Sequence, residues 1–212
     1  MDQQFSFFDL PTVDNSEIKV QNEQRCITLA NESGHIPARF KDARFNDKTV
    51  EQAAIIKSFC LDPEDNVCIL SGPCGNGKTF LSCAAMHERA VNGLSAGEYV
   101  SCRTLKQRIK STYSFASKVT EMDLYTHYAS VPFLILDEVG KCTDAQLEWD
   151  FVTTIIALRY DNELPLLITT NFTFGQFKDF IVTANGAGSD IFDRLNSVKI
   201  AVGFNSESLR NR

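Results

Sequence analysis

The chain has 212 residues, 43% hydrophobic and 23% charged, which is enough to bury one full core. Its formal net charge of −6 excludes a polycation that coats DNA or an anionic membrane, so nucleic-acid contact requires a local basic patch. The seven cysteines are odd in number, scattered and free of any Cys-x-x-Cys pair, which argues against a disulfide framework or zinc site and favours a reducing cytosol.

The sequence has neither a signal peptide nor an apolar run long enough to span a bilayer. We therefore expect a soluble cytoplasmic protein that makes no membrane contact. Residues 1–34 are expected to form a flexible tail, because residues 9–33 are mostly polar and follow no sustained period. Within this tail the stretch QFSFF at residues 4–8 has apolar anchors that suit a groove on a partner protein.

The domain itself is expected to cover residues 35–212, where apolar runs alternate with segments of helical period. The expected strands cover 66–71, 98–102, 131–137, 164–170 and 198–204, and the expected helices cover 78–91, 104–115, 144–160 and 174–182. Apolar strands that alternate with helices predict an α/β fold with a five-stranded parallel sheet flanked by helices. Ligands bind such sheets at the carboxyl ends of the strands.

The sequence GPCGNGKT, residues 72–79, follows the first strand and fits the pattern G-x-x-x-x-G-K-[ST]. Its glycines let backbone N–H groups turn toward phosphate oxygens, and the next helix offers its positive dipole end. Lys78 is expected to reach the β- and γ-phosphates of ATP, and the Thr79 hydroxyl to bind Mg²⁺. The alternative is a glycine-rich turn that fits by chance. The residues expected to hold the nucleotide are Gly72, Pro73, Cys74, Gly75, Asn76, Gly77, Lys78, Thr79 and Phe80.

The third strand ends in FLILDEVG and delivers two adjacent carboxylates, which are costly at a strand end unless they are used or solvated. Asp137 suits the coordination of Mg²⁺, and Glu138 suits the orientation and deprotonation of an attacking water. The alternative is a pair of exposed acids. The fourth strand ends in ITTN, and Asn171 is expected beside the γ-phosphate, with a helix cap as the alternative.

These residues, in this order, resemble the AAA+ ATPases, with Walker A at 72–79, Walker B at 133–138 and sensor 1 at Asn171. The closer resemblance is to DnaC/DnaI-type replicative helicase loaders and their IstB-like relatives, over about residues 36–212. It is carried by IPARFKDARF, DEVG, ALRYDNELPLLITTN, DIFDRL and the ending FNSESLRNR. The resemblance implies a P-loop NTPase fold of the AAA+ type, an arginine finger at Arg194 and a sensor 2 residue at Arg210.

The chain departs from this family in two ways. Asp190 stands where the family often carries a basic residue, and the N-terminal region is short for a helicase-binding domain. No full C-terminal lid domain is expected. An arginine finger that serves a neighbour's γ-phosphate implies head-to-tail self-association. The alternatives are a surface salt bridge of Arg194 with Asp190 or Asp193, and a solvated Arg210.

Between the second and third strands lies RTLKQRIKSTYSFASK, a basic window without an acidic residue. Cations along a path, with Tyr113 and Phe115 interleaved for stacking, suit single-stranded DNA, and the resembling family contacts DNA with this part of its core. The alternative is a solvated helix face with core aromatics. The residues expected to contact DNA are Arg103, Lys106, Arg108 and Lys110.

The QFSFF stretch resembles the peptide by which bacterial proteins dock on the sliding clamp of DNA polymerase. The residues expected to contact the clamp are Gln4, Phe5, Phe7 and Phe8. The alternatives are another partner, such as the helicase, or a segment that folds back on the core.

Taken together, the residues and the resemblance predict an ATPase that uses ATP and Mg²⁺ and resembles helicase loaders in DNA replication. Its hydrolysis is expected to be weak and stimulated by a partner or DNA, and its expected partner is a replicative helicase of the DnaB type. It would act in the cytoplasm of a bacterium or of a phage's host. Two alternatives stay open: an IstB-like ATPase that assists a transposase, and a non-catalytic nucleotide-binding adaptor or inhibitor of replication proteins.

Overall fold

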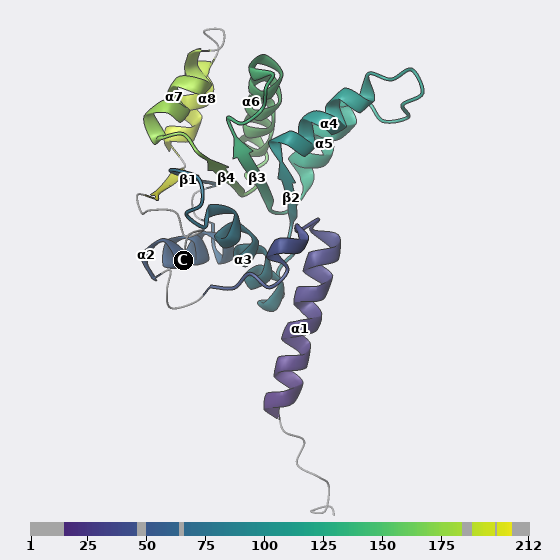
Figure 1. The fold of residues 1–212 in the computed structure, drawn as a ribbon, viewed down its shortest axis with the longest axis vertical. Coiled ribbons are helices and arrows are strands. Elements are labelled where there is room, and N and C mark those ends of the chain that lie inside the picture. The colour runs from purple at the N-terminus through teal and green to yellow at the C-terminus, as the bar shows by residue number, and fades with distance from the viewer. Residues whose placement is uncertain (1–14, 46–49, 64–65, 184–187, 198, 205–212) are drawn as a thin grey trace, which may run out of the picture.

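The fold is a five-stranded parallel sheet covered by helices on both faces, as the sequence predicts (Figure 1). The computed structural model describes residues 15–45, 50–63, 66–183, 188–197 and 199–204. The strands are β1 (Val67–Ser71), β2 (Glu98–Ser101), β3 (Leu134–Val139), β4 (Leu166–Thr170) and β5 (Lys199–Gly203). They lie in the order β2-β3-β4-β1-β5. Because all the paired strands are parallel, each strand is joined to the next in the sequence by a crossover connection that contains one or more helices.

Alternate residues of the strands face two separate cores. On one face Ile69, Leu136 and Ile168 pack beneath one layer of helices, which Figure 1 shows together on that side of the sheet. The helices of this layer are α4 (Cys102–Thr112), α5 (Glu121–Ser130), α6 (Ala145–Asp161), α7 (Phe174–Thr183) and α8 (Gly188–Ser197). On the other face Leu70 and Leu167 pack against α2 (Val50–Leu61) and α3 (Lys78–Val91).

Residues 15–33, expected to belong to a flexible tail, instead form helix α1 (Asn15–Ser33), followed by the short 3-10 helix Ala38–Phe40. The helix lacks a strong apolar stripe, and its docking rests on few side chains. Ile27 and Ala30 are buried where α1 packs on α3, and His87 Nε2 of α3 lies 3.0 Å from Asn31 Oδ1. Tertiary packing therefore stabilises a segment whose own pattern indicates a coil.

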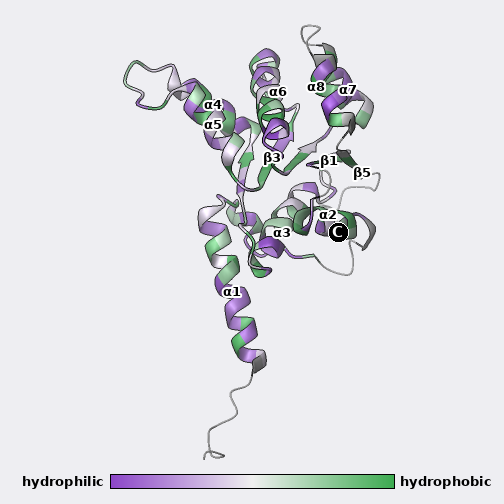
Figure 2. Cartoon of the chain, turned by 180° about the vertical axis from the view of Figure 1, so that it is seen from behind, coloured by the Kyte–Doolittle hydropathy of each residue, from purple (hydrophilic) through white to green (hydrophobic). Residues whose placement is uncertain are grey.

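The first half of α1 projects away from the body of the molecule, and most of its residues are hydrophilic (Figure 2). None of the helices within the described ranges is long and apolar enough to cross a membrane. The docking peptide predicted at residues 4–8 lies outside the described residues. Helix α1 thus lies within the segment expected as a tail, before the domain boundary predicted at residue 35.

If α1 is a docked part of the domain, Ile27→Ala should lower the free energy of unfolding by about 2 kcal/mol, because it removes a buried side chain. Ile27 is 4% exposed, whereas Val20 on the same helix is 65% exposed, so Val20→Ala serves as the matched control. Urea denaturation followed by circular dichroism measures both. Equal, small effects of the two substitutions would mean that α1 does not pack on the domain.

Candidate nucleotide-binding site

The predicted site residues meet where three neighbouring strands end. Thr170 of β4 is paired with Ser71 of β1 on one side and with Val139 of β3 on the other. The P-loop (residues 72–79) follows β1 directly, and Asn171 follows β4. The two acids, Asp137 and Glu138, lie near the end of β3. Crossover connections therefore bring segments far apart in the sequence to one edge of the sheet.

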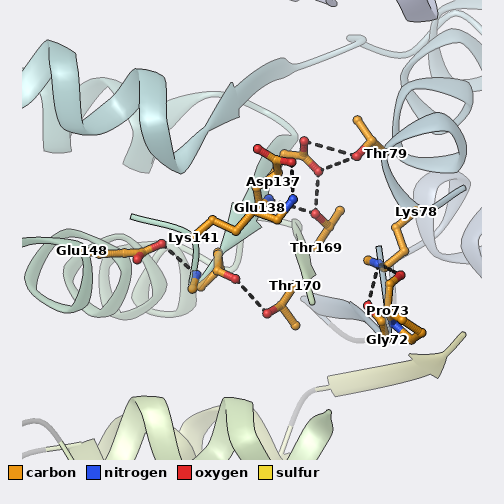
Figure 3. A network of polar contacts seen from close by, with 12 residues as sticks. Gly72, Pro73, Lys78, Thr79, Asp137, Glu138, Lys141, Glu148, Thr169 and Thr170 are labelled. Atoms are coloured by element: carbon orange, nitrogen blue, oxygen red, sulfur yellow. Dashed lines mark hydrogen bonds and ion pairs between the residues drawn. The ribbon is translucent and has the colours of Figure 1, made fainter. Parts of the chain in front are cut away.

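Backbone carbonyls of the P-loop bind the side chain of its lysine, Lys78. Lys78 is buried at the start of α3, and its Nζ donates hydrogen bonds to the carbonyls of Gly72 (2.7 Å) and Pro73 (2.8 Å) (Figure 3). Gly72 has a φ of 135°, and a Cβ there would lie 2.3 Å from the carbonyl oxygen of Phe204, so only glycine fits. Gly77, with a φ of 86°, is the N-cap of α3. The loop therefore gathers an ammonium and a helix N-terminus in one place.

Asp137 is the buried centre of the site, with 2% of its surface exposed. It accepts hydrogen bonds from Tyr99 (2.6 Å), from Thr79 (3.0 Å) and from Thr169. Burial raises the pKa of the Asp137 carboxyl, and the hydrogen bonds from Thr169, Tyr99 and Thr79 oppose that rise. A carboxylate beside a threonine hydroxyl is a set of hard oxygen ligands that fits Mg²⁺.

Thr169 connects the two acids of β3. Its hydroxyl donates to Asp137 and accepts a hydrogen bond from the backbone N–H of Glu138 at 3.0 Å. Glu138 has a φ of 63°, in the left-handed region that residues other than glycine rarely adopt. The register between β3 and β4 shifts between Leu136 and Val139, so the chain leaves regular strand geometry where the acids lie.

The side chain of Glu138 is held by a residue that the sequence did not single out. Lys141 Nζ lies 2.5 Å from Glu138 Oε1. The loop that carries Lys141 is fixed by Glu148 of α6, which is buried and accepts hydrogen bonds from the backbone N–H groups of Gly140 and Cys142. Sequence reasoning missed these contacts because they depend on the path of the chain after β3.

Asn171 is half-buried and directly follows β4. In the sheet, β4 is the neighbour of β3, the strand that carries the two acids. The alternative role, a cap for α7, is filled by Thr173. Its Oγ1 accepts a hydrogen bond from Gln176 N at 3.3 Å, and Gln176 Oε1 accepts one from Thr173 N at 2.8 Å. The cap of α7 is therefore Thr173, and the sensor role of Asn171 stays a prediction.

The two predicted arginines of the C-terminal region have different outcomes. Arg194 lies on α8, where it forms an ion pair with Asp161 of α6 at 3.0 Å and lies 5.4 Å from the centroid of the Tyr160 ring. Asp190 is exposed one turn earlier on α8. Arg210 lies outside the described residues.

The predicted basic track on α4 is divided between two faces of the helix. Arg103, Lys106 and Lys110 share one face, whereas Arg108 lies on another and forms an ion pair with the buried Glu98 at 3.1 Å. Because Arg108 pairs with Glu98 of the same chain, we no longer include it among the residues expected to contact DNA. The aromatic residues after α4 are exposed, with Tyr113 at 61%, which excludes the alternative that they are core aromatics.

The comparison with known families decides what this fold and site belong to. The family model described as "IstB-like ATP binding protein" matches residues 15–212. The chain belongs to this family. The match begins at the first residue of α1, in agreement with the docking of that helix on the domain.

Curated relatives of this family member include replicative helicase loaders. DnaC of Escherichia coli strain K12 is 26% identical over 147 residues, which cover 68% of this chain and 56% of DnaC. DnaC of Buchnera aphidicola subsp. Baizongia pistaciae is 27% identical over the same length, with the same coverage. The chain thus spans about half the length of the curated relatives it matches.

Solved structures confirm the predicted AAA+ fold. A crystal structure of DnaI matches with a TM-score of 0.63 and 19% identity, over 81% of this chain and 96% of that one. The DnaC helicase loader matches with a TM-score of 0.62 and 19% identity, over 80% and 100% of the two chains. AMPPCP-bound DnaA from Aquifex aeolicus matches with a TM-score of 0.58 and 18% identity, over 81% of this chain and 52% of DnaA.

Thr169→Val should weaken binding of ATP with Mg²⁺ most strongly at acidic pH. The hydrogen bond from Thr169 opposes the burial that raises the pKa of Asp137, so its loss raises that pKa further. Protonated Asp137 cannot bind a cation, so affinity should begin to fall at a higher pH than in the unaltered protein, by about tenfold in the affected range.

Titration of a fluorescent ATP analogue with Mg²⁺ from acidic to neutral pH measures this shift. Thr154→Val is the matched control, because Thr154 lies on α6 and its hydroxyl donates to the backbone carbonyl of Asp150. An unchanged pH dependence in Thr169→Val would contradict the role given to this residue.

Proposed function

We propose that the chain binds and hydrolyses ATP with Mg²⁺ and acts as a helicase-loader-like factor in DNA replication. The observation that carries the proposal is the convergence of the P-loop lysine with Thr79, Asp137 and Glu138 at the carboxyl ends of adjacent strands. The family's description as ATP-binding proteins and the helicase loaders among the curated relatives support it.

In the proposed reaction the P-loop amides and Lys78 bind the phosphates of ATP. Thr79 and Asp137 would hold Mg²⁺, which neutralises charge on the phosphate oxygens when bound. Glu138 accepts a proton from a water whose oxygen forms a bond to the γ-phosphorus, while the bond from that phosphorus to the β–γ bridging oxygen breaks. Asn171 orients the same water from the end of β4.

Head-to-tail self-association completes this proposal, because an arginine finger acts on the nucleotide of a neighbouring subunit. Arg194 is the proposed finger. It contacts Asp161 and Tyr160 of its own chain, and both contacts are at the surface, so a neighbour's phosphate can replace them. Arg210 remains the proposed sensor 2 residue.

The proposed partners are a replicative helicase of the DnaB type and single-stranded DNA, which would place the protein in the cytoplasm of a bacterium or of a phage's host. Arg103, Lys106 and Lys110 on one face of α4, with exposed Tyr113 and Phe115 beyond them, support DNA contact. The clamp is the proposed partner of the peptide at 4–8. A role beside a transposase is the competing function.

A pull-down from bacterial lysate with non-hydrolysable ATP should retain replicative helicase. We expect Phe7→Ala/Phe8→Ala to lose the sliding clamp and keep the helicase, because the two aromatic anchors belong to the proposed clamp peptide. Mass spectrometry identifies the retained proteins. Capture of a transposase without helicase or clamp would overturn the replication proposal in favour of transposition.

Single-stranded DNA binding should depend on the cations of one face of α4. Arg103→Ala/Lys110→Ala should weaken binding to oligo(dT) and lower the slope of log affinity against log salt by about 1.4, the value for two lost phosphate contacts. Fluorescence anisotropy at several salt concentrations measures both quantities. Lys57→Ala/Lys178→Ala removes the same charge from exposed positions elsewhere and should leave the slope unchanged; equal effects of the two pairs would refute a track on α4.

A further inference from the structure

The loop after β3, residues 140–144, joins β3 to α6 and is anchored on both sides of Lys141. We name it the β3–α6 loop. Glu148 is 1% exposed and accepts hydrogen bonds from Gly140 N (2.7 Å) and Cys142 N (3.0 Å). Because one buried carboxylate binds the backbone before and after Lys141, the position of Lys141 follows the first turns of α6.

Lys141 in turn restrains the residue proposed as the general base. Its ammonium lies 2.5 Å from Glu138 Oε1, with side-chain exposures of 32% for Lys141 and 37% for Glu138. Figure 3 shows Lys141 on the side of α6, with Lys78 and Thr79 on the other side of the acids. The ion pair thus occupies one carboxylate oxygen and holds the side chain toward the loop. The left-handed φ of Glu138 is a conformation that persists where surrounding contacts hold it.

The same loop is bound to the basic face of α4. Lys106 Nζ donates to Thr143 Oγ1 at 3.0 Å, and Lys110 Nζ lies 3.4 Å from Asp144 Oδ2. Asp144 is also the N-cap of α6, where its side chain accepts a hydrogen bond from Leu147 N. The cations proposed to bind DNA phosphates therefore hold the N-terminus of the helix that carries Glu148.

We infer that Lys141 is a positioning residue that restrains Glu138, and that single-stranded DNA on α4 releases this restraint. DNA phosphates compete with Thr143 and Asp144 for Lys106 and Lys110. When Lys106 and Lys110 no longer contact the β3–α6 loop, the first turns of α6, with Glu148, are free to shift. Lys141 then moves away from Glu138. The freed carboxylate then accepts the proton of the attacking water. This inference rests on the proposed function and adds the route by which DNA regulates it.

An alternative explanation treats the pair Glu138–Lys141 as an ordinary exposed ion pair three residues apart, which contributes little and affects no rate. The two explanations differ in what happens when the charge of Lys141 is removed. If Lys141 restrains Glu138, removing its charge increases the rate of ATP hydrolysis without DNA. If the ion pair has no role in hydrolysis, that rate stays unchanged.

Lys141→Met removes the ammonium and keeps the aliphatic stem. We expect its kcat for ATP hydrolysis without DNA to rise about fivefold with an unchanged KM, and its stimulation by oligo(dT) to shrink by a similar factor. Lys141→Arg, which keeps the charge, should behave like the unaltered protein. Steady-state phosphate release with and without oligo(dT) measures these rates, and Glu138→Gln defines the background.

Two further variants test the route through the loop. Lys106→Ala/Lys110→Ala should also raise the rate without DNA, and its combination with Lys141→Met should add nothing further, because both remove one restraint. Lys57→Met is the matched control, since Lys57 forms a comparable ion pair with Glu88 at 2.8 Å away from the site. It should change neither rate.

The outcomes separate the inference from the proposed function. If the unaltered protein hydrolyses ATP and responds to DNA but Lys141→Met has the same or a lower rate without DNA, the inference is overturned and the function stands. If the unaltered protein is inactive with and without DNA, the proposed function fails as stated. An active Lys141→Met would then support the restraint, and an inactive one would overturn it too.

Discussion

The structure depends on the burial of one carboxylate, Asp137, near the carboxyl end of β3 in the middle of the site. Such a group is costly to bury unless hydrogen bonds replace its water, and three hydroxyls do so here. They come from Thr79 at the start of α3, Tyr99 on β2 and Thr169 on β4. Burial and the neighbouring carboxylate of Asp137 raise the pKa of Tyr99, so the phenol stays protonated and donates a hydrogen bond to Asp137. The contacts that satisfy Asp137 therefore also fix the P-loop and two strands around the site.

The second acid is held differently. Glu138 is partly exposed, its backbone departs from strand geometry, and its carboxylate pairs with a lysine from the loop that follows. The buried acid thus suits cation binding, and the partly exposed one suits proton transfer, although the two residues are neighbours in the sequence. Glu148, buried at the start of α6, binds the loop that carries Lys141 to the helix layer on that face of the sheet.

The periphery of the domain carries features that a partner could use. The first half of α1 projects beyond the body, and the connection between α4 and α5 extends outward (Figure 1). Tyr113 and Phe115 in that connection are exposed. Arg194 is engaged with α6 of its own chain. The contacts of Arg194 lie at the surface, where exchange for a partner's groups costs little. The centre of the site is thus buried and hydrogen-bonded, whereas the contacts of Arg194 lie at the surface.

The sequence by itself determined the P-loop, the acids Asp137 and Glu138, Asn171 and the five strands, because each depends on neighbouring residues or on an apolar run. Helices α1, α2, α5 and α8 were not predicted. The apolar periodicity of α1, α2 and α5 is weak, and such a pattern does not reveal a helix that packing stabilises, whereas α8 is amphipathic and its helical pattern was overlooked. The contacts of Tyr99 and Thr169 with Asp137 needed the order β2-β3-β4-β1, which crossovers decide and no local pattern encodes. The same reason explains Arg108: its charge was visible in the sequence, but only the tertiary structure placed the buried Glu98 beside it.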